Sequence, residues 1–184
     1  MATIKLERDR IADADLPVAQ LARQMRLPEG YATVPGQEAR LQARLRAAIA
    51  DIEARLAKSL LLRGAVMERI VGGGRDCPLM LAPVREVLSV KRLDAGAPEM
   101  LEVATLRAEA HCSIVSLVRP VPEGARLRFV LRAGYGGWDD LPEGAAQAVL
   151  LLAEGLDSGD AEAASRRAAA LIAPERDLRL GARG

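Results

Sequence analysis

The chain has 184 residues, of which 50% are hydrophobic and 28% charged, and its formal net charge is +1. These values are ordinary for a globular protein, and the near-neutral charge gives no sign of a generally basic nucleic-acid or membrane-surface binder. The charged N-terminus argues against a signal peptide, and the longest apolar run, 145–153, is far below the ~20 residues that span a bilayer. Two cysteines make no disulfide framework, so we expect a soluble protein made in a reducing compartment, with no membrane partner.

Two helices are predicted near the N-terminus. Residues 15–26 place apolar side chains at helical spacing, with Asp15 in the N-cap position and Pro17 in the first turn. Residues 37–62 repeat apolar residues every three or four positions, which predicts one long amphipathic helix. Such a helix would be about 39 Å long, which indicates a scaffold rod or a helix that packs on a neighbouring subunit. Its apolar stripe consists of Leu41, Leu45, Ile49, Ile52, Leu56 and Leu60.

The middle of the chain, about 63–132, predicts a small antiparallel β insertion. Residues 82–94 are rich in β-branched side chains, as expected of a strand. Residues 111–119 and 125–132 flank the string PVPEG, whose Pro and Gly residues suit a hairpin loop. We therefore expect two strands joined by a turn at this string.

The second of these strands alternates apolar and basic side chains, a period of two that predicts one buried and one solvated face. The apolar set is Leu127, Phe129 and Leu131, and the basic set is Arg126, Arg128 and Arg132. A basic stripe with one aromatic residue leaves open a nucleic-acid-binding regulator as an alternative function. A solvated strand face is the simpler interpretation.

Helices are predicted again towards the C-terminus. Asp140 and Glu143 form a D-x-x-E start that resembles a capping box, so a helix is expected from Leu141. Residues 161–173 predict a final helix, which Pro174 ends.

The expected fold class is α+β and mainly helical. It is a helical bundle of a short helix, a long helix and two C-terminal helices, with an inserted small antiparallel β subdomain and an extended C-terminal tail. We expect a single domain over 1–184, with helical parts at 15–62 and 141–173, the β insertion at about 63–132 and the tail at 174–184.

The string RAGYGGWDDLP joins the predicted sheet to the C-terminal helices and holds two of the few aromatic residues of the chain. Its glycines permit a sharp turn, and its aromatic side chains supply large apolar area. We expect a packed structural joint rather than a reactive site. The joint residues are Tyr135, Trp138, Asp140 and Pro142.

Candidate chemistry is sparse. The string VGGGRD at 71–76 lacks the Lys-Ser/Thr of a phosphate-binding loop, so we expect a flexible turn there. His111 and Cys112 are neighbours on a predicted strand and would point to opposite faces, which does not suit a nucleophile–base pair. A small cytosolic enzyme or ligand-binding domain that uses these two residues and Asp139 is the other alternative. We assign no catalytic residue, cofactor or metal.

The order of the elements and several strings resemble a known family. A strand written APVREVLSVKRLD is followed by a hairpin, by RFVLRAGYGGWDDLPEGAAQAVLLLAEGL and, after a last helix, by APERDLRL. This series is similar to the head–tail connector, or adaptor, proteins of long-tailed phages and phage-derived gene transfer agents. Members carry a strand that ends in Ala/Thr-Gly-Tyr, a Gly-rich or acidic loop, a Pro and an Ala/Leu-rich helix. The resemblance covers about 15–180.

The resemblance implies a structural, non-enzymatic protein without cofactors. It would form a homo-oligomeric ring, commonly dodecameric, in the neck of a virion or phage-like particle, after synthesis in the bacterial cytoplasm. The ring would dock under the portal protein, present a platform for a downstream connector, stopper or tail component, and extend a channel that passes DNA without sequence-specific binding. By position in the family, Arg176, Leu178, Arg179 and Leu180 of the tail are expected to contact the portal.

Overall fold

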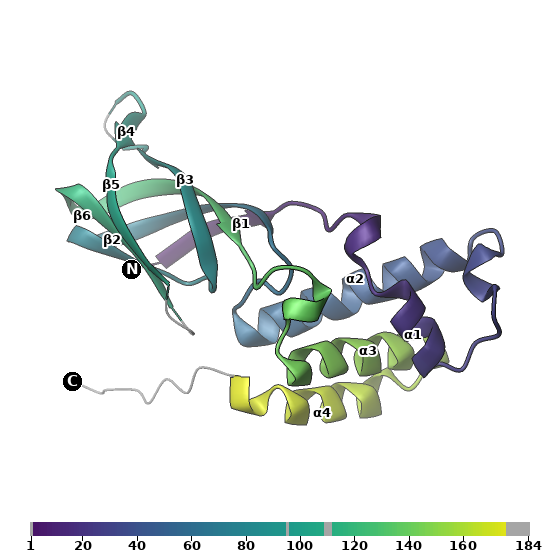
Figure 1. Ribbon diagram of the computed structural model, residues 1–184. Coiled ribbons are helices and arrows are strands. Elements are labelled where there is room, and N and C mark those ends of the chain that lie inside the picture. Colours follow the sequence, from purple (N-terminus) through teal and green to yellow (C-terminus); the bar gives the residue numbers. More distant parts are fainter. Residues whose placement is uncertain (1, 95, 109–111, 176–184) are drawn as a thin grey trace. The chain divides into compact units, whose positions relative to one another are not determined.

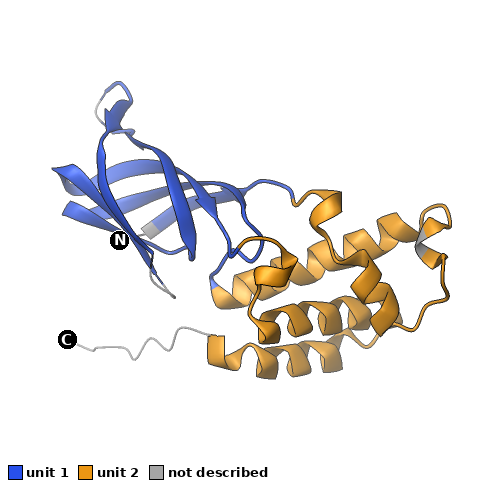
Figure 2. Ribbon diagram, in the orientation of Figure 1, with its two compact units in different colours: residues 1–10, 57–135 blue, residues 11–56, 136–184 orange. Residues whose placement is uncertain are grey.

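The computed structural model describes residues 2–94, 96–108 and 112–175 (Figure 1). The chain forms two compact units, and each is assembled from two separate stretches of sequence (Figure 2). Unit 1 consists of Met1–Arg10 and Ala57–Tyr135, and unit 2 of Ile11–Leu56 and Gly136–Gly184. The portal-contact residues expected in the tail, 176–180, lie outside the described residues, as does His111.

Unit 1 is a curved antiparallel sheet of six strands (Figure 1). The strands run in the spatial order β1-β2-β6-β3-β4, and β5 also pairs with β6. β6 is therefore the central strand: β2 follows one side of it, while β3 and β5 share the other. The strands are β1 (Ala2–Arg8), β2 (Arg63–Leu79), β3 (Val84–Arg92), β4 (Glu99–Leu101), β5 (Val103–Ala108) and β6 (Ser113–Ala133).

The Gly-rich string at 71–76 is a bend within β2, and the expected separate turn is wrong. Gly73 and Gly74 adopt positive φ of 84° and 89°, and the pairing with β6 shifts at this point. The guanidinium of Arg69 donates to the carbonyl of Pro78 on the same strand. Nine extended residues would span about 30 Å, more than an arginine side chain reaches, so this bond shows how sharply the strand curls.

The hairpin expected at PVPEG is also wrong, because this string lies within the continuous 21-residue strand β6. β5 pairs with residues 113–117 and β3 with residues 127–133, so between these stretches β2 is the only ladder partner of β6 among the described strands. Pro120 and Pro122 occupy this gap. Proline has no N–H to donate and is found in sheets where a strand edge is unpaired.

The apolar core of unit 1 confirms the period of two expected for residues 125–132. Leu127, Phe129 and Leu131 are fully buried, and the intervening arginines face solvent. Phe129 lies opposite Met67 on β2 and Val90 on β3, which are also fully buried. This cross-strand row forms the centre of the sheet's core.

Unit 2 contains the α-helices of the described chain (Figure 1). They are α1 (Val18–Gln24), α2 (Gln37–Leu56), α3 (Glu143–Ser158) and α4 (Ala161–Leu171). Asp157 of α3 accepts two hydrogen bonds of 2.8 Å from Arg40 of α2 and so ties these two helices together. α3 and α4 pack so closely that a Cβ added at Gly155 would overlap the side chain of Ala164.

The expectation of a mainly helical fold is wrong, because helix and strand each account for 39% of the structure. One reason is that Ala2–Arg8 forms an edge strand that was not foreseen. A second is that the expected helix over 37–62 ends at Leu56, and Ala57 takes a left-handed φ of 53°. Leu60 fits the helical stripe only by its spacing, since it is buried in unit 1. With 20 residues, α2 is too short to support the expected scaffold rod or helix that packs on a neighbouring subunit.

Two expected helix starts are displaced. Asp15 belongs to a short 3-10 turn (Asp13–Asp15), and Pro17 is the N-cap of α1. Asp140 belongs to a second 3-10 turn, and the N-cap of α3 is Pro142. In both cases proline fixes the φ angle at the helix entrance without a side-chain cap.

Candidate assembly surfaces

Tyr135 is the last residue of unit 1 and is held there by backbone and side-chain contacts. Its N–H donates to the carbonyl of Leu60 at 2.8 Å, and its own carbonyl accepts from the guanidinium of Arg85 at 2.7 Å. The ammonium of Lys58 lies 6.0 Å from the centre of the ring, within range of a cation–π interaction. Tyr135 therefore completes unit 1.

Trp138 lies at the start of the C-terminal stretch of unit 2. Its indole N–H donates to the side-chain oxygen of Gln20 in α1 at 2.7 Å. The carboxylate of Asp140 accepts from the N–H of Gly137 at 2.8 Å and closes the 3-10 turn that carries the indole. Pro142 follows at the start of α3. The four expected joint residues thus divide between the two units, and their role as a joint stays a prediction.

Trp138→Ala is expected to lower the free energy of unfolding of unit 2 by about 1–3 kcal/mol, since it removes half-buried aromatic area and one hydrogen bond. Thermal unfolding followed by circular dichroism measures the change. Gln20→Ala is the matched control: it deletes the hydrogen-bond partner but keeps the ring, and about 1 kcal/mol is expected. Equal effects of the two variants would show that packing of the indole contributes nothing.

Glu68 is a buried carboxylate that the sequence patterns did not single out. It lies on β2 directly opposite Arg128, and its side chain is only 4% exposed. Its two oxygens accept from Arg126 at 2.6 Å and from Arg128 at 2.6 and 2.8 Å. The two arginines predicted to form a solvated stripe therefore clamp an acid of the neighbouring strand. This structural role weakens the nucleic-acid alternative, because neither guanidinium is unpaired.

The hydrogen bonds from Arg126 and then Arg128 hold the pKa of Glu68 below its ordinary value of 4.5, although burial opposes them. A lowered pKa in the folded state means that the folded form binds the proton less readily than the unfolded chain. The clamp therefore stabilises unit 1 above about pH 4.5, and this contribution is lost as the pH falls through the lower folded-state value.

Glu68→Gln is expected to make the free energy of unfolding depend less steeply on pH in the acid range. Urea unfolding between pH 3 and pH 6 measures the effect: the variant should lose less stability than the parent chain over this range. An unaltered slope in Glu68→Gln would refute the clamp's contribution.

Of the residues of the enzymatic alternative, the structure describes Cys112 and Asp139, which belong to different units. Cys112 donates weakly to the carbonyl of Leu79 in unit 1, whereas Asp139 is exposed in unit 2. Burial raises the pKa of the Cys77 thiol, which favours its unreactive form. Within the described ranges no three His, Cys, Asp or Glu side chains are grouped as metal ligands, and no helix there is long and apolar enough to cross a bilayer.

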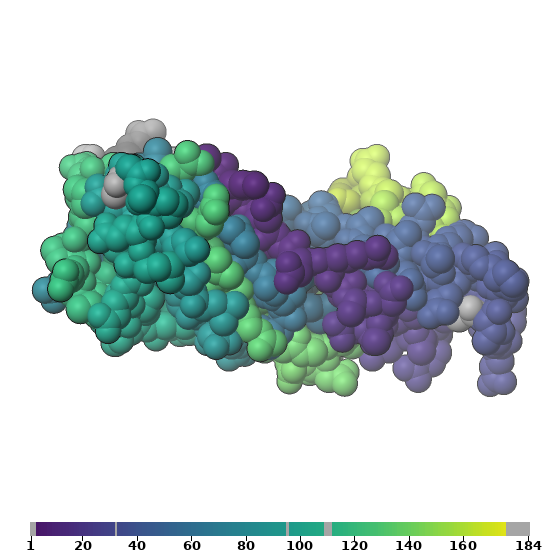
Figure 3. Space-filling model, turned by 90° about the horizontal axis from the view of Figure 1, so that it is seen from above, coloured from purple at the N-terminus to yellow at the C-terminus, as the bar shows by residue number. Residues whose placement is uncertain are grey.

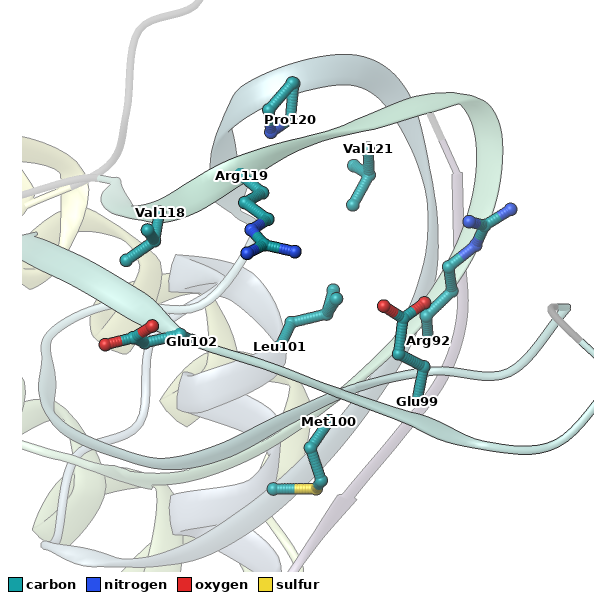
Figure 4. A pocket seen from close by; sticks show the side chains of 9 residues that line it. All are labelled: Arg92, Glu99, Met100, Leu101, Glu102, Val118, Arg119, Pro120 and Val121. Atoms are coloured by element: carbon teal, nitrogen blue, oxygen red, sulfur yellow. The ribbon is translucent and has the colours of Figure 1, made fainter.

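A hollow of about 260 Å³ opens in unit 1 beside the unpaired stretch of β6 (Figure 4). Leu101 of β4 and Val121 of β6 point into it and form its apolar floor, and the guanidinium of Arg119 is directed over them. No hydrogen bond or ion pair joins the side chain of Arg119 to any of the described residues. Glu99 stands at the other end beside Arg92, whose guanidinium is held by Asp94 at 3.1 Å.

Several large apolar side chains are exposed on the surfaces of the two units. Within unit 1 they gather near two edges of the sheet: Ile4 and Ile70 at the β1 edge, and Met100 and Val118 beside the hollow. The remaining ones are Leu88 on β3 and, in unit 2, Val34. Sequence reasoning missed these groups, because only the strand register shows which apolar residues are neighbours on the outside.

Three comparisons place the chain among known proteins. No protein-family profile and no curated protein matches it. It is similar to a chain in the neck of an empty gene transfer agent (GTA) particle computed with C6 symmetry, with 30% identity and a TM-score of 0.81. It is likewise similar to chains in the virion of a native GTA particle (30%, TM-score 0.79) and in the neck of a native GTA particle computed with C12 symmetry (29%, TM-score 0.75).

Each likeness covers 97% of this chain and 98% of the other chain. Both units are therefore included, and so is the edge strand β1 that the sequence patterns did not foresee. An identity of 30% over nearly the full length of both chains shows common descent as well as a common fold. The chain belongs to the head–tail connector (adaptor) family of long-tailed phages and phage-derived gene transfer agents.

Proposed function

We propose that the chain is a structural adaptor in the neck of a gene transfer agent or related phage-like particle. The observation that carries the proposal is the match over 97% of the chain to proteins of GTA necks and virions. A structural role also fits the chemistry of the described residues, since the candidate reactive groups are scattered over two units.

Within the neck, the chain would form a ring of identical copies. The similar neck structures were computed with C6 and C12 symmetry, which supports a cyclic arrangement with twelve copies as the expected number. Cyclic assemblies are closed by heterologous contacts, in which one patch of each subunit meets a different patch of the next. The ring would sit under the portal, extend the DNA channel and hold the next tail component.

The near-neutral net charge of +1 suits a protein that lines a channel through which DNA must slide. Each Lys or Arg that neutralises a phosphate adds affinity and would slow passage. Two arginines of the most basic strand are already occupied by Glu68, which leaves fewer free cations on this face.

Deletion of the gene tests the proposed function. We expect DNA-filled heads without tails, restored to tailed particles by the intact chain supplied in trans, and we expect mass spectrometry to find the chain in intact particles. Tailed particles in the deletion strain, or intact particles that lack the chain, would refute the proposal.

A truncation after Glu175 tests the proposed contact of the tail with the portal. If Arg176, Leu178, Arg179 and Leu180 provide that contact, the truncated chain should fold, with circular dichroism like that of the intact chain, yet fail to join particles. Arg176→Glu with Arg179→Glu should weaken incorporation, because both guanidinium charges are reversed. Normal incorporation of the truncated chain would exclude the contact.

A further inference from the structure

We propose that neighbouring copies in the ring are joined through two different surfaces of the unit 1 sheet. The outer face of β1 in one copy would pack on the hollow beside β4 in the next copy. The inference rests on the proposed function, because it needs a ring, and it goes further by naming the two surfaces and the residues that meet.

The receiving surface is the hollow between β4 and the unpaired stretch of β6. Its floor is apolar, formed by Leu101 and Val121, and two cations and two anions line it: Arg92, Arg119, Glu99 and Glu102 (Figure 4). The hydrogen bond from Val118 N–H to the carbonyl of Glu102, 2.9 Å, closes one end. An apolar floor with a cation that has no partner among the described residues is suited to a polypeptide segment with one apolar and one acidic side chain.

The inserting surface is the edge strand β1, which pairs with β2 alone among the described strands. A bulge between the pairs Thr3–Arg69 and Lys5–Glu68 pushes Ile4 outward, where 48% of it is exposed. A bulge with outward charges is a common way to keep an edge strand from uncontrolled pairing. Here it also makes an isoleucine the most prominent apolar group on this edge.

The charges of the two surfaces are complementary. Next to Ile4, Lys5 and Glu7 form an exposed ion pair of 2.7 Å. Beside the floor of the hollow stand Glu99, Glu102 and Arg119, whose side chain has no partner among the described residues, together with Arg92, which Asp94 holds. With Ile4 on the apolar floor, Lys5 would face Glu99 and Glu7 would face Arg119. One exposed ion pair in each copy would thus be replaced by pairs across the interface.

The position of the two surfaces fits a ring. β1 and β4 are the first and last strands of the spatial order β1-β2-β6-β3-β4, while β6, which forms the other side of the hollow, is separated from β1 by β2. Two different patches on one sheet give each copy one donor and one acceptor, as a heterologous ring contact requires. β3, β4 and β5 are teal in the view from above, where their side chains lie at the surface of unit 1 (Figure 3).

Cysteine cross-linking in assembled particles tests the contact. A disulfide forms only when two Cα atoms lie within about 7 Å. Ile4→Cys is therefore combined with Met100→Cys, which lies at the rim of the hollow. The same chain also carries Cys112→Ser. Mild oxidation should convert the monomer band of purified particles into a ladder of multimers on a non-reducing gel. A short bismaleimide should give the same ladder where the sulfur geometry is unfavourable.

Three controls make the result specific. Either introduced cysteine alone should give no ladder, because each interface needs both. Leu88→Cys with Met100→Cys should give none either, since Leu88 is similarly exposed on β3 but is not at the β1 edge. Lys5→Glu should reduce the ladder of the main pair, and Lys5→Glu with Glu99→Lys should restore it.

The outcomes separate this inference from the proposed function. A chain that enters particles but gives no ladder with either reagent overturns the inference and leaves the adaptor role standing. Cross-linking of the Ile4→Cys variant to a different particle protein overturns it as well, since that protein would then occupy the β1 edge. Absence of the chain from particles refutes the proposed function itself.

Discussion

Gly134→Ala is expected to prevent unit 1 from folding, and a loss of about 3 kcal/mol or more is the smallest effect consistent with its surroundings. Gly134 has a φ of +136°, a conformation that residues with a side chain rarely adopt. A Cβ at this position would lie 2.5 Å from the nitrogen of Leu62 and closer still to the carbonyl of Leu61. Backbone atoms of a neighbouring segment cannot rotate away as a flexible side chain can.

The surrounding hydrogen bonds prevent the backbone from retreating. The N–H of Gly134 donates to Pro83 at 2.9 Å, and the next N–H, of Tyr135, donates to Leu60 at 2.8 Å. Relief of the overlap would break these bonds, which connect the end of β6 to the segments before β2 and β3. The close approach therefore explains why glycine stands in the Ala-Gly-Tyr string that resembles the connector family.

Gly124→Ala is the matched control for Gly134→Ala. Gly124 lies on β6 and also has a positive φ, of 81°, but no atom lies within 4 Å of the Cβ that alanine would add. Only the left-handed backbone is penalised there, by about 1–2 kcal/mol. Hydrogen exchange followed by mass spectrometry should show β6 and β3 unprotected in Gly134→Ala and protected in Gly124→Ala. Equal protection in both variants would exclude the steric argument.

The helices could be predicted from the sequence, because the signals that form them are local. The stripe from Leu41 to Leu56 lies on α2 as expected, and α3 and α4 follow the C-terminal apolar patterns closely. The end of α2 was misplaced because Leu60 continues the helical spacing by coincidence. Periodicity alone does not reveal that the chain leaves the helix at Ala57 and enters another unit.

The sheet was only partly predictable, because its pairing is not local. The alternation from Arg126 to Arg132 revealed one strand and its buried face. The strand β1 carries too many charged residues to be recognised alone, and it gains its place through pairing with β2, about sixty positions away. The prolines of PVPEG indicate a turn by composition, yet a strand edge left open between β5 and β3 accepts them equally well.

The candidate assembly surfaces could not be predicted for the same reason. Ile4 and Ile70, or Met100 and Val118, are far apart in sequence, and each is unremarkable as a single exposed apolar residue. The register of the strands brings them to the two edges of the sheet. The family, in contrast, was identified from the order of short strings, because order along a chain needs no knowledge of pairing.

Phe129→Ala is expected to destabilise unit 1 by about 3–5 kcal/mol, the range for removing a large buried aromatic side chain. Phe129 is the only phenylalanine, is fully buried and lies in the central strand between Met67 and Val90. With so few aromatic residues, the core has no other large ring that could move into the cavity. A loss of this size is a large share of the 5–15 kcal/mol that holds a typical domain together.

Urea unfolding of the purified variant measures the loss, and the choice of probe matters. The only tryptophan, Trp138, lies in unit 2, so its fluorescence reports on that unit, whereas far-ultraviolet circular dichroism includes the sheet. Phe129→Leu should cost much less stability, since leucine fills most of the space. Leu88→Ala, on the solvated face of β3, should change stability by no more than about 0.5 kcal/mol.

If the proposed ring contact is correct, Phe129→Ala should also reduce incorporation into particles, because both contacting surfaces belong to the sheet that this side chain supports. Normal stability of Phe129→Ala would mean that the row Met67–Phe129–Val90 is not the centre of the core.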